Sequence, residues 1–155
     1  MTLLDTPSDL RRAAACLQPV LTDLLELQAQ AKQLHWCVVG PGFASLHATL
    51  DAVAGEAAAR ADELAERMRA LGGVPNGRTA DVAAGTTLAP APSGEVPVDV
   101  AAAHVVRGIR RAVAAVQAAR EEVERLDPAS VDLLNGAILA VEKVAWLVAA
   151  EGYAR

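Results

Sequence analysis

Four long segments of this chain repeat their apolar residues at the spacing of an α-helix, and stretches that contain glycine or proline separate them. Residues three or four positions apart share one face of a helix, so each segment predicts an amphipathic helix. Gly-Pro-Gly at 40–42 closes the first segment, and Gly72 with Gly73 closes the second. The predicted helices run from about residue 8 to 39, 43 to 71, 99 to 125 and 130 to 152. The expected fold class is therefore all-α.

The first predicted helix has a recognisable start and one internal irregularity. Thr6 or Ser8 is expected to be its N-cap and Pro7 suits the first turn, so residues 1–7 are assigned to an N-terminal tail. Pro19 lies inside the pattern and is expected to bend the helix or to divide it, because proline lacks the backbone N–H.

Residues 74–97 form a long connection between the second and third predicted helices. The stretch is rich in proline and glycine and carries a short alanine segment with room for one or two helical turns. Four long helices with a long middle connection are typical of a ferritin-like four-helix bundle. A length of 155 residues suits a single domain, 1–155. Aromatic residues make up only 3%, so the core is thin, and we expect part of the apolar surface to be buried against other subunits.

The charge and the cysteines exclude several classes of function. The formal net charge is −5, which provides no general attraction to nucleic acid or anionic lipid. Cys16 and Cys37 have neither CxxC nor zinc-site spacing and are expected to be free thiols in a reducing cytosol. No secretory signal is evident, and no segment looks long and uncharged enough to span a bilayer. The expected location is the cytoplasm, without membrane contact.

Two of the three histidines and three carboxylates fall at regular positions along one stretch of the chain. With ~100° of turn per residue, Asp51 lies at ~40°, Asp62 at ~60° and Glu66 at ~100° from His47. The large apolar residues of the same helix centre near about −90°, so this histidine–carboxylate stripe does not face the core. His35 lies across the Gly-Pro-Gly turn from His47. Each residue alone is more often solvated or packed, but the five together predict a metal site.

The two ends of the stripe are too far apart to bind one ion within one chain. Asp51 and Asp62 are separated by ~16 Å along the helix, whereas metal–ligand distances are ~2.0–2.2 Å. An antiparallel second copy, with its two-fold axis near residues 55–57, brings the histidine end of one stripe opposite the Asp62–Glu66 end of the other. Imidazoles and carboxylates without thiolates suit Fe(II), Mn(II) or Zn(II), and we expect iron.

A resemblance to a known family extends over nearly the whole chain. Residues 31–73, AKQLHWCVVGPGFASLHATLDAVAGEAAARADELAERMRALGG, resemble the signature of the Dps family, the mini-ferritins known as DNA-binding proteins from starved cells. The stretch contains KQ-x-HW, G-x-x-F-x-x-LH-x-x-x-D, D-x-x-AER and LGG elements at matching spacing. Residues 86–100 and 127–151 resemble the middle connection and the last helix of that family.

The resemblance implies a four-helix bundle assembled as a hollow dodecamer, with a ferroxidase site shared across each dimer two-fold. Trp36 matches a tryptophan beside that site, with a plain packing role as its alternative. The implied activity is oxidation of Fe(II), preferably by hydrogen peroxide, with storage of ferric mineral and protection of the cell and its DNA from oxidative damage. The residues that match the family's iron ligands are His35, His47 and Asp51 of one subunit with Asp62 and Glu66 of its mate.

Three positions near the stripe depart from the family pattern. Cys37 stands where the family normally has asparagine, and a thiol there is open to oxidation. Ala48 and Ala52 stand where acidic residues often help to nucleate mineral. Nucleation is expected to be weaker or to use other residues, of which Glu56 is one candidate.

Two acidic residues near the last helix resemble the lining of a pore at a three-fold axis, through which iron enters. Asp127 and Asp132 match these positions, while Gly136 replaces a third acidic residue and makes the pore less negative. Asp127 is alternatively a cap before Pro128, and the two roles are compatible.

DNA binding is expected to be weak. Arg11 and Arg12 lie inside the first predicted helix, so the chain has no basic tail, and a shell of twelve such chains multiplies the negative charge. A nucleoid-associated, DNA-compacting protein with little ferroxidase activity is the main alternative. An enzyme with a di-iron centre inside the bundle would need Glu-x-x-His pairs, and His104 is not part of one. A helical scaffold whose stripe is only an interface is a further alternative.

Overall fold

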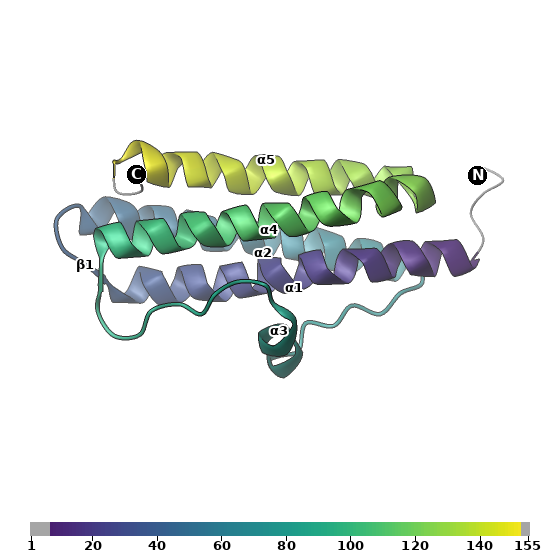
Figure 1. Ribbon diagram of the computed structural model, residues 1–155, viewed down its shortest axis with the longest axis horizontal. Helices are drawn as coiled ribbons and strands as arrows, with labels where there is room; N and C mark the ends of the chain where they lie inside the picture. The colour runs from purple at the N-terminus through teal and green to yellow at the C-terminus, as the bar shows by residue number, and fades with distance from the viewer. Residues whose placement is uncertain (1–6, 153–155) are drawn as a thin grey trace.

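The computed structural model describes residues 7–152 and shows long helices that lie side by side (Figure 1). A short helix, α3 (Thr79–Gly85), lies in the connection between the second and third of them. Strands β1 (Val38–Val39) and β2 (Val96–Pro97) pair near one end of the bundle. The long helices are α1 (Pro7–Cys37), α2 (Phe43–Ala70), α4 (Val98–Leu126) and α5 (Pro128–Ala150). The prediction of an all-α four-helix bundle with a short helix in its middle connection is confirmed.

α1 is one continuous helix that begins at Pro7. The last residue of the expected tail is therefore helical, and Ser8 lies inside the helix rather than at its N-cap. Thr6, the other expected cap, lies outside the described residues. Pro19 does not divide α1, because the buried residues around it hold that turn between α2 and α4 even though one backbone hydrogen bond is lost.

α2 has a buried face and a polar face, as its periodicity predicts. Leu46, Leu50 and Leu64 are at most 1% exposed. Asp62 and Glu66 lie on the exposed side of the same helix. The histidine–carboxylate stripe is therefore directed away from the core, and the core itself is closed by the inward faces of the other three long helices.

The long connection is required by the direction of the helices. α2 and α4 run parallel and lie diagonally across the bundle, so the chain must return along its whole length between them (Figure 1). Gln18 fixes the start of the return by exchanging two hydrogen bonds of 2.9 Å with the backbone of Asn76. Asp23, which is buried, accepts hydrogen bonds from the backbone N–H and the hydroxyl of Thr87 at 2.7 and 2.6 Å. These contacts hold the connection against α1.

The far end of the connection forms a short parallel strand pair that the sequence did not predict. Val38 lies opposite Val96, and both are buried. Gln30 donates a hydrogen bond of 2.9 Å to the carbonyl oxygen of Ala89. Together these contacts place the turn that follows α1 beside the start of α4.

α5 corrects the expectation that no segment is long and apolar enough to cross a membrane. Its 23 residues meet that criterion by length and composition, with a mean hydropathy of 1.6 in the most apolar window. The helix packs against α4 and α2 and contributes Leu134, Val141 and Val148 to the core. A core helix of a soluble bundle meets the same criterion, and 28% of this window is buried within the single chain.

Candidate metal centre

The end of α1 and the start of α2 bring His35 and His47 into direct contact. Their rings stack with centroids 3.6 Å apart and an interplanar angle of 21°. The Nδ1 atom of His35 lies 2.7 Å from the carbonyl oxygen of His47, and the Nδ1 atom of His47 lies 2.7 Å from the carbonyl oxygen of His35. The tight turn at 40–42 thus joins two histidines that are twelve residues apart in a reciprocal pair.

These reciprocal hydrogen bonds determine which tautomer each neutral ring adopts. A carbonyl oxygen only accepts, so each Nδ1 must carry the proton that it donates. In the neutral imidazole the lone pair then lies on Nε2, which is the form that binds a metal ion. A hydrogen bond from the second ring nitrogen to a carbonyl is the usual way in which proteins orient a ligating histidine. Both histidines are therefore prepared as ligands through Nε2.

Asp51 lies one helical turn beyond His47 and forms an ion pair with Lys32 of α1. The hydrogen bond from Lys32, and then its charge, lower the pKa of Asp51 below its usual value, with smaller contributions from the two histidines. Asp51 is therefore ionised near neutral pH and available to a cation. The pairing of Lys32 with Asp51, nineteen positions apart, was not predicted from the sequence.

Asp62 and Glu66 are not brought to the histidines within the chain. They follow Asp51 by three to four helical turns and are exposed. Asp62 borders a cavity of about 280 Å³ whose other walls include Leu25, Ala61 and Pro75. Among residues 7–152, no group of three or more histidine, cysteine, aspartate or glutamate side chains is arranged to hold a metal ion. The predicted five-residue set is therefore incomplete in one chain.

The other residues singled out near the stripe are mostly accessible. The Trp36 side chain is 70% exposed, and Ala48 and Ala52 are exposed. Cys37 is a free thiol whose sulfur accepts a hydrogen bond of 3.2 Å from Gln33. Cys16 is also a free thiol, as predicted.

Asp127 is buried, which the sequence did not predict. Arg67 of α2 donates hydrogen bonds of 2.8 Å to both of its carboxylate oxygens, and the hydroxyl of Ser130 donates another. Asp127 is the N-cap residue of α5, as predicted, but its side chain makes no capping hydrogen bond to the backbone there. Asp132 is exposed. Lining of an iron pore by Asp127 and Asp132 stays a prediction.

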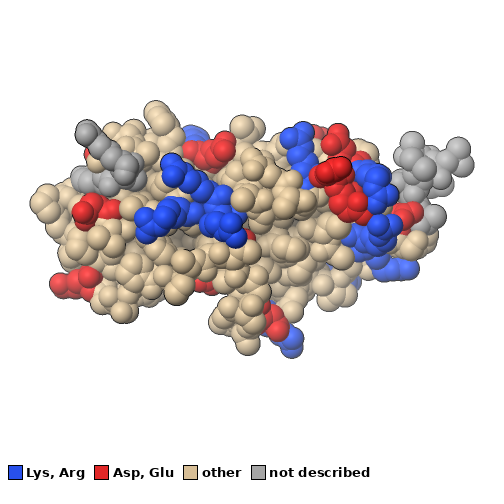
Figure 2. All heavy atoms as spheres, viewed as in Figure 1, with Lys and Arg blue, Asp and Glu red and all other residues tan. Residues whose placement is uncertain are grey.

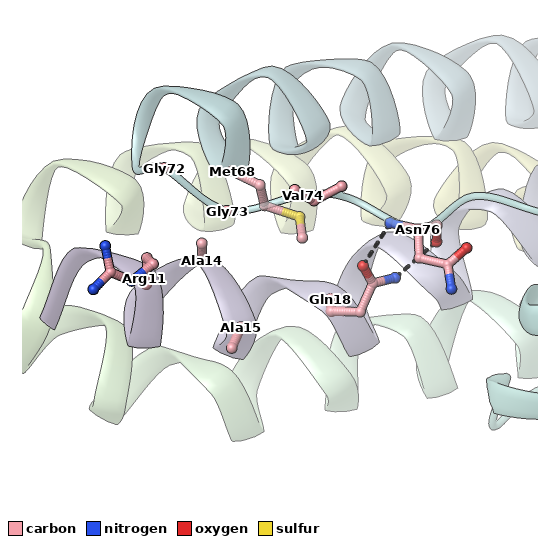
Figure 3. A pocket seen from close by; sticks show the side chains of 9 residues that line it. All are labelled: Arg11, Ala14, Ala15, Gln18, Met68, Gly72, Gly73, Val74 and Asn76. Carbon is pink, nitrogen blue, oxygen red and sulfur yellow. Dashed lines mark hydrogen bonds between the residues drawn. The ribbon is translucent and has the colours of Figure 1, made fainter. Parts of the chain in front are cut away.

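A roomy cavity of about 630 Å³ lies at the opposite end of α2 from the histidines (Figure 3). Gly73, Val74 and Met68 border it, and Arg11 is its one ionisable lining residue among those the structure describes. No carboxylate or histidine is among the lining residues of this cavity.

Comparisons with known proteins agree with this fold. The family model of the ferritin-like domain matches residues 14–151. A DNA protection during starvation protein of Mycolicibacterium smegmatis is 32% identical over 147 residues, which cover 88% of this chain and 75% of the relative. The fine tangled pili major subunit of Haemophilus ducreyi is 33% identical over 144 residues, which cover 88% of this chain and 72% of that protein.

The solved structures show the same similarity in three dimensions. The structure of Dps from Microbacterium arborescens in the high iron form superposes with a TM-score of 0.89 at 32% sequence identity, and the match covers 96% of this chain and 97% of that one. A ferritin-like bundle, a Dps-like sequence over most of the length and a Dps-like backbone coincide in one molecule, and this chain accordingly belongs to the Dps family of ferritin-like proteins.

Proposed function

We propose that this chain oxidises Fe(II) to Fe(III) at a site formed by two copies of the chain, and that the assembled protein stores the ferric product. The observation that carries the proposal is the histidine pair. The Nδ1–H group of each ring donates a hydrogen bond to a backbone carbonyl oxygen, and each Nε2 keeps its lone pair for a metal ion. Membership of the Dps family supports it, since one structural relative is described in a high iron form.

In this proposal Fe(II) is the substrate. The Nε2 atoms of His35 and His47 and the carboxylate of Asp51 bind it from one chain, and Asp62 and Glu66 bind it from the mate. Hard carboxylate oxygens favour Fe(III) over Fe(II), so they lower the free-energy cost of removing an electron. We propose hydrogen peroxide as the preferred oxidant. Two Fe(II) ions give two electrons to one peroxide, which with two protons becomes two water molecules without releasing hydroxyl radical.

The proposal requires a homo-oligomer. Several large apolar side chains are exposed on the single chain, including Trp36 at 70%, Leu139 at 70% and Trp146 at 64%. Apolar side chains exposed to this extent favour burial against other subunits. We propose that two-fold dimers build a dodecameric shell, that it works in the cytoplasm, where Cys16 and Cys37 stay reduced, and that it protects the cell and its DNA from iron-driven oxidation.

The proposal is tested by anaerobic titration of the purified protein with Fe(II), followed by stoichiometric hydrogen peroxide. Ferric absorbance in the near ultraviolet gives the rate. We expect fast oxidation by the parent protein, and a loss of at least about a hundredfold in His47→Ala and in Asp62→Ala, because each removes a ligand. Oxidation by the parent no faster than in buffer would refute the proposal.

Mixed assemblies test whether the site is shared between chains. A dimer of one His47→Ala chain and one Asp62→Ala chain has both defects in one site and none in the other. Random mixing of the two variants should therefore restore about a quarter of the parent rate, because half of the dimers are mixed and each has one intact site of two. A mixture of His35→Ala with His47→Ala is the matched control, since every site then keeps one defect and no recovery is expected.

A further inference from the structure

Three arginines lie close together on α4, far along the chain from the histidine–carboxylate stripe. Arg107, Arg110 and Arg111 are all exposed. The space-filling view shows basic side chains gathered over the first half of α4, the segment to which these three arginines belong (Figure 2). We call these three residues the arginine patch. The patch is locally positive, whereas the chain as a whole carries a net charge of −5.

The arginine patch has no acidic partner within residues 7–152. Lys32, Arg67 and Arg125 each form an ion pair with a carboxylate, and so do Arg12, Arg60 and Arg78, but none of the three patch arginines does. Arg107 and Arg111 are four positions apart, where like charges on a helix repel each other. The repulsion is therefore uncompensated in the described part of the chain, and an anion would relieve it.

Arg107 and Arg111 border the same cavity, which has a volume of about 220 Å³. The buried residues His104 and Gly108 line it from α4, and Thr87 with Ala89 lines it from the connection. This volume is well above the ~10–15 Å³ that one water molecule needs, and below the ~300 Å³ at which pockets for larger ligands begin. The cavity therefore suits a small hydrated anion.

Hydrogen bonds hold the walls of this cavity in place. The Nε2 atom of His104 lies 2.7 Å from the side-chain oxygen of Gln30, and Gln30 in turn donates to the carbonyl oxygen of Ala89. Asp23 binds both the backbone N–H and the hydroxyl of Thr87. A pocket whose walls are already fixed loses less conformational entropy when a ligand binds.

We propose that this cavity is a phosphate-binding site in which Arg107 and Arg111 bind the oxyanion and Arg110 adds to the local positive potential. Guanidinium groups present planar pairs of N–H donors that match the oxygens of a phosphate. Two such groups balance the charge of a phosphate dianion. The phosphate comes either as the free anion or as the backbone of a polynucleotide, and the two sources share this chemistry. The site is independent of the proposed ferroxidase centre.

The test uses the assembled, metal-free protein at low ionic strength, so that iron cannot bind the anion. Isothermal titration with inorganic phosphate and a mobility-shift assay with a short DNA duplex give the two affinities. The variants are Arg107→Gln/Arg111→Gln, the charge-preserving Arg107→Lys/Arg111→Lys, and the control Arg120→Gln, which removes an exposed arginine of α4 outside the cavity.

We expect the parent protein and Arg120→Gln to bind phosphate saturably and with similar affinity. The affinity should be at least about tenfold lower in Arg107→Gln/Arg111→Gln, called the glutamine variant below, and intermediate in Arg107→Lys/Arg111→Lys. Binding of the duplex alone, lost in the glutamine variant, would assign the site to polynucleotide phosphates. The proposal is overturned if neither probe binds, or if the glutamine variant binds both as the parent does. It is also overturned if the glutamine variant loses its assembly in size-exclusion chromatography, because the arginines would then pair with a neighbouring copy.

Discussion

Within the described residues, two carboxylate–cation pairs join α2 to other segments, one toward each end of the helix, and they differ in burial. Near the start, Asp51 and Lys32 have side chains that are 54% and 41% exposed. Near the end, the side chains of Asp127 and Arg67 are only 10% and 29% exposed. Arg67 binds both oxygens of its partner and also the hydroxyl of Ser130. One pair is open to solvent, and the other is closed by its neighbours.

The difference separates residues that hold the fold from residues that can bind a ligand. A buried pair with satisfied hydrogen bonds fixes the two segments that supply it, here the end of α2 and the corner between α4 and α5. An exposed pair contributes little to stability and can exchange its partner for another cation. The same distinction applies to the histidines, because His35 and His47 keep free Nε2 atoms while His104 uses its Nε2 inside the bundle.

The largest expected effect is at the closed pair. Arg67→Ala should lower the free energy of unfolding by about 3 kcal/mol, because it leaves a buried carboxylate without its counter-charge. Lys32→Ala is the matched control and should leave stability unchanged within error, since both members of its pair are exposed. Denaturant unfolding at one fixed protein concentration measures both. Equal losses in the two variants would show that burial does not distinguish the pairs.

A second prediction concerns the backbone that follows the closed end of α2. A Cβ atom at Gly73 would lie 2.6 Å from the Cβ of Ala14 and 3.2 Å from the carbonyl oxygen of Met68. Gly73→Ala should therefore destabilise the chain by about 1–3 kcal/mol, because α1 must shift to make room. The thermal midpoint and the denaturant midpoint should fall together. An unchanged midpoint would mean that the contact between α1 and this turn is not tight.

A third prediction concerns the middle of the stripe, where nothing lies within 4 Å of a Cβ atom built at Gly55. The variant is Gly55→Ala. Alanine in a helix is favoured over glycine by about 0.5–1 kcal/mol, so the free energy of unfolding of the single chain should rise. In the proposed dimer a second helix crosses near this point, and the added methyl group should weaken association by a similar amount. Sedimentation at several concentrations measures the association. Unchanged association with a gain in stability would place the crossing elsewhere.

The spacing of apolar residues predicted the features that depend on residues close together in sequence, namely the helix bounds and the face on which each side chain lies. The helix bounds were close to those observed, and His47, Asp62 and Glu66 fell on the polar face because a helix fixes the direction of each side chain by its position. The first helix was the exception. Pro19 predicted a bend or a division, and the helix is not divided there because it packs against two other helices.

Pairings between distant segments could not be predicted in this way. Arg67 and Asp127 are sixty positions apart, and a single helix pattern shows which face is polar but not which residue of another helix it meets. The reciprocal hydrogen bonds of His35 and His47 depend on the exact path of the turn between them. The arginine patch could not be predicted from the net charge, because net charge does not show how charged side chains are distributed over the surface.

The smallest predicted effect concerns His104, which is buried and uses its Nε2 in a hydrogen bond, unlike His35 and His47. Burial, and then the charge of Arg107, lower the pKa of His104 below its usual value. The unfolded chain therefore binds this proton at a higher pH than the folded chain does. The resulting stability is fully present above about pH 6.5 and is lost as the pH falls from there through the lower pKa of the folded state.

His104→Gln removes this titration, because glutamine carries no proton to lose. The difference in unfolding free energy between the parent and His104→Gln should therefore shrink as the pH falls from 8 to about 5.5. Denaturant unfolding in buffers without phosphate keeps the arginine patch from contributing. A difference for His104→Gln that is independent of pH would show that its ring is as open to protonation in the folded chain as in the unfolded one.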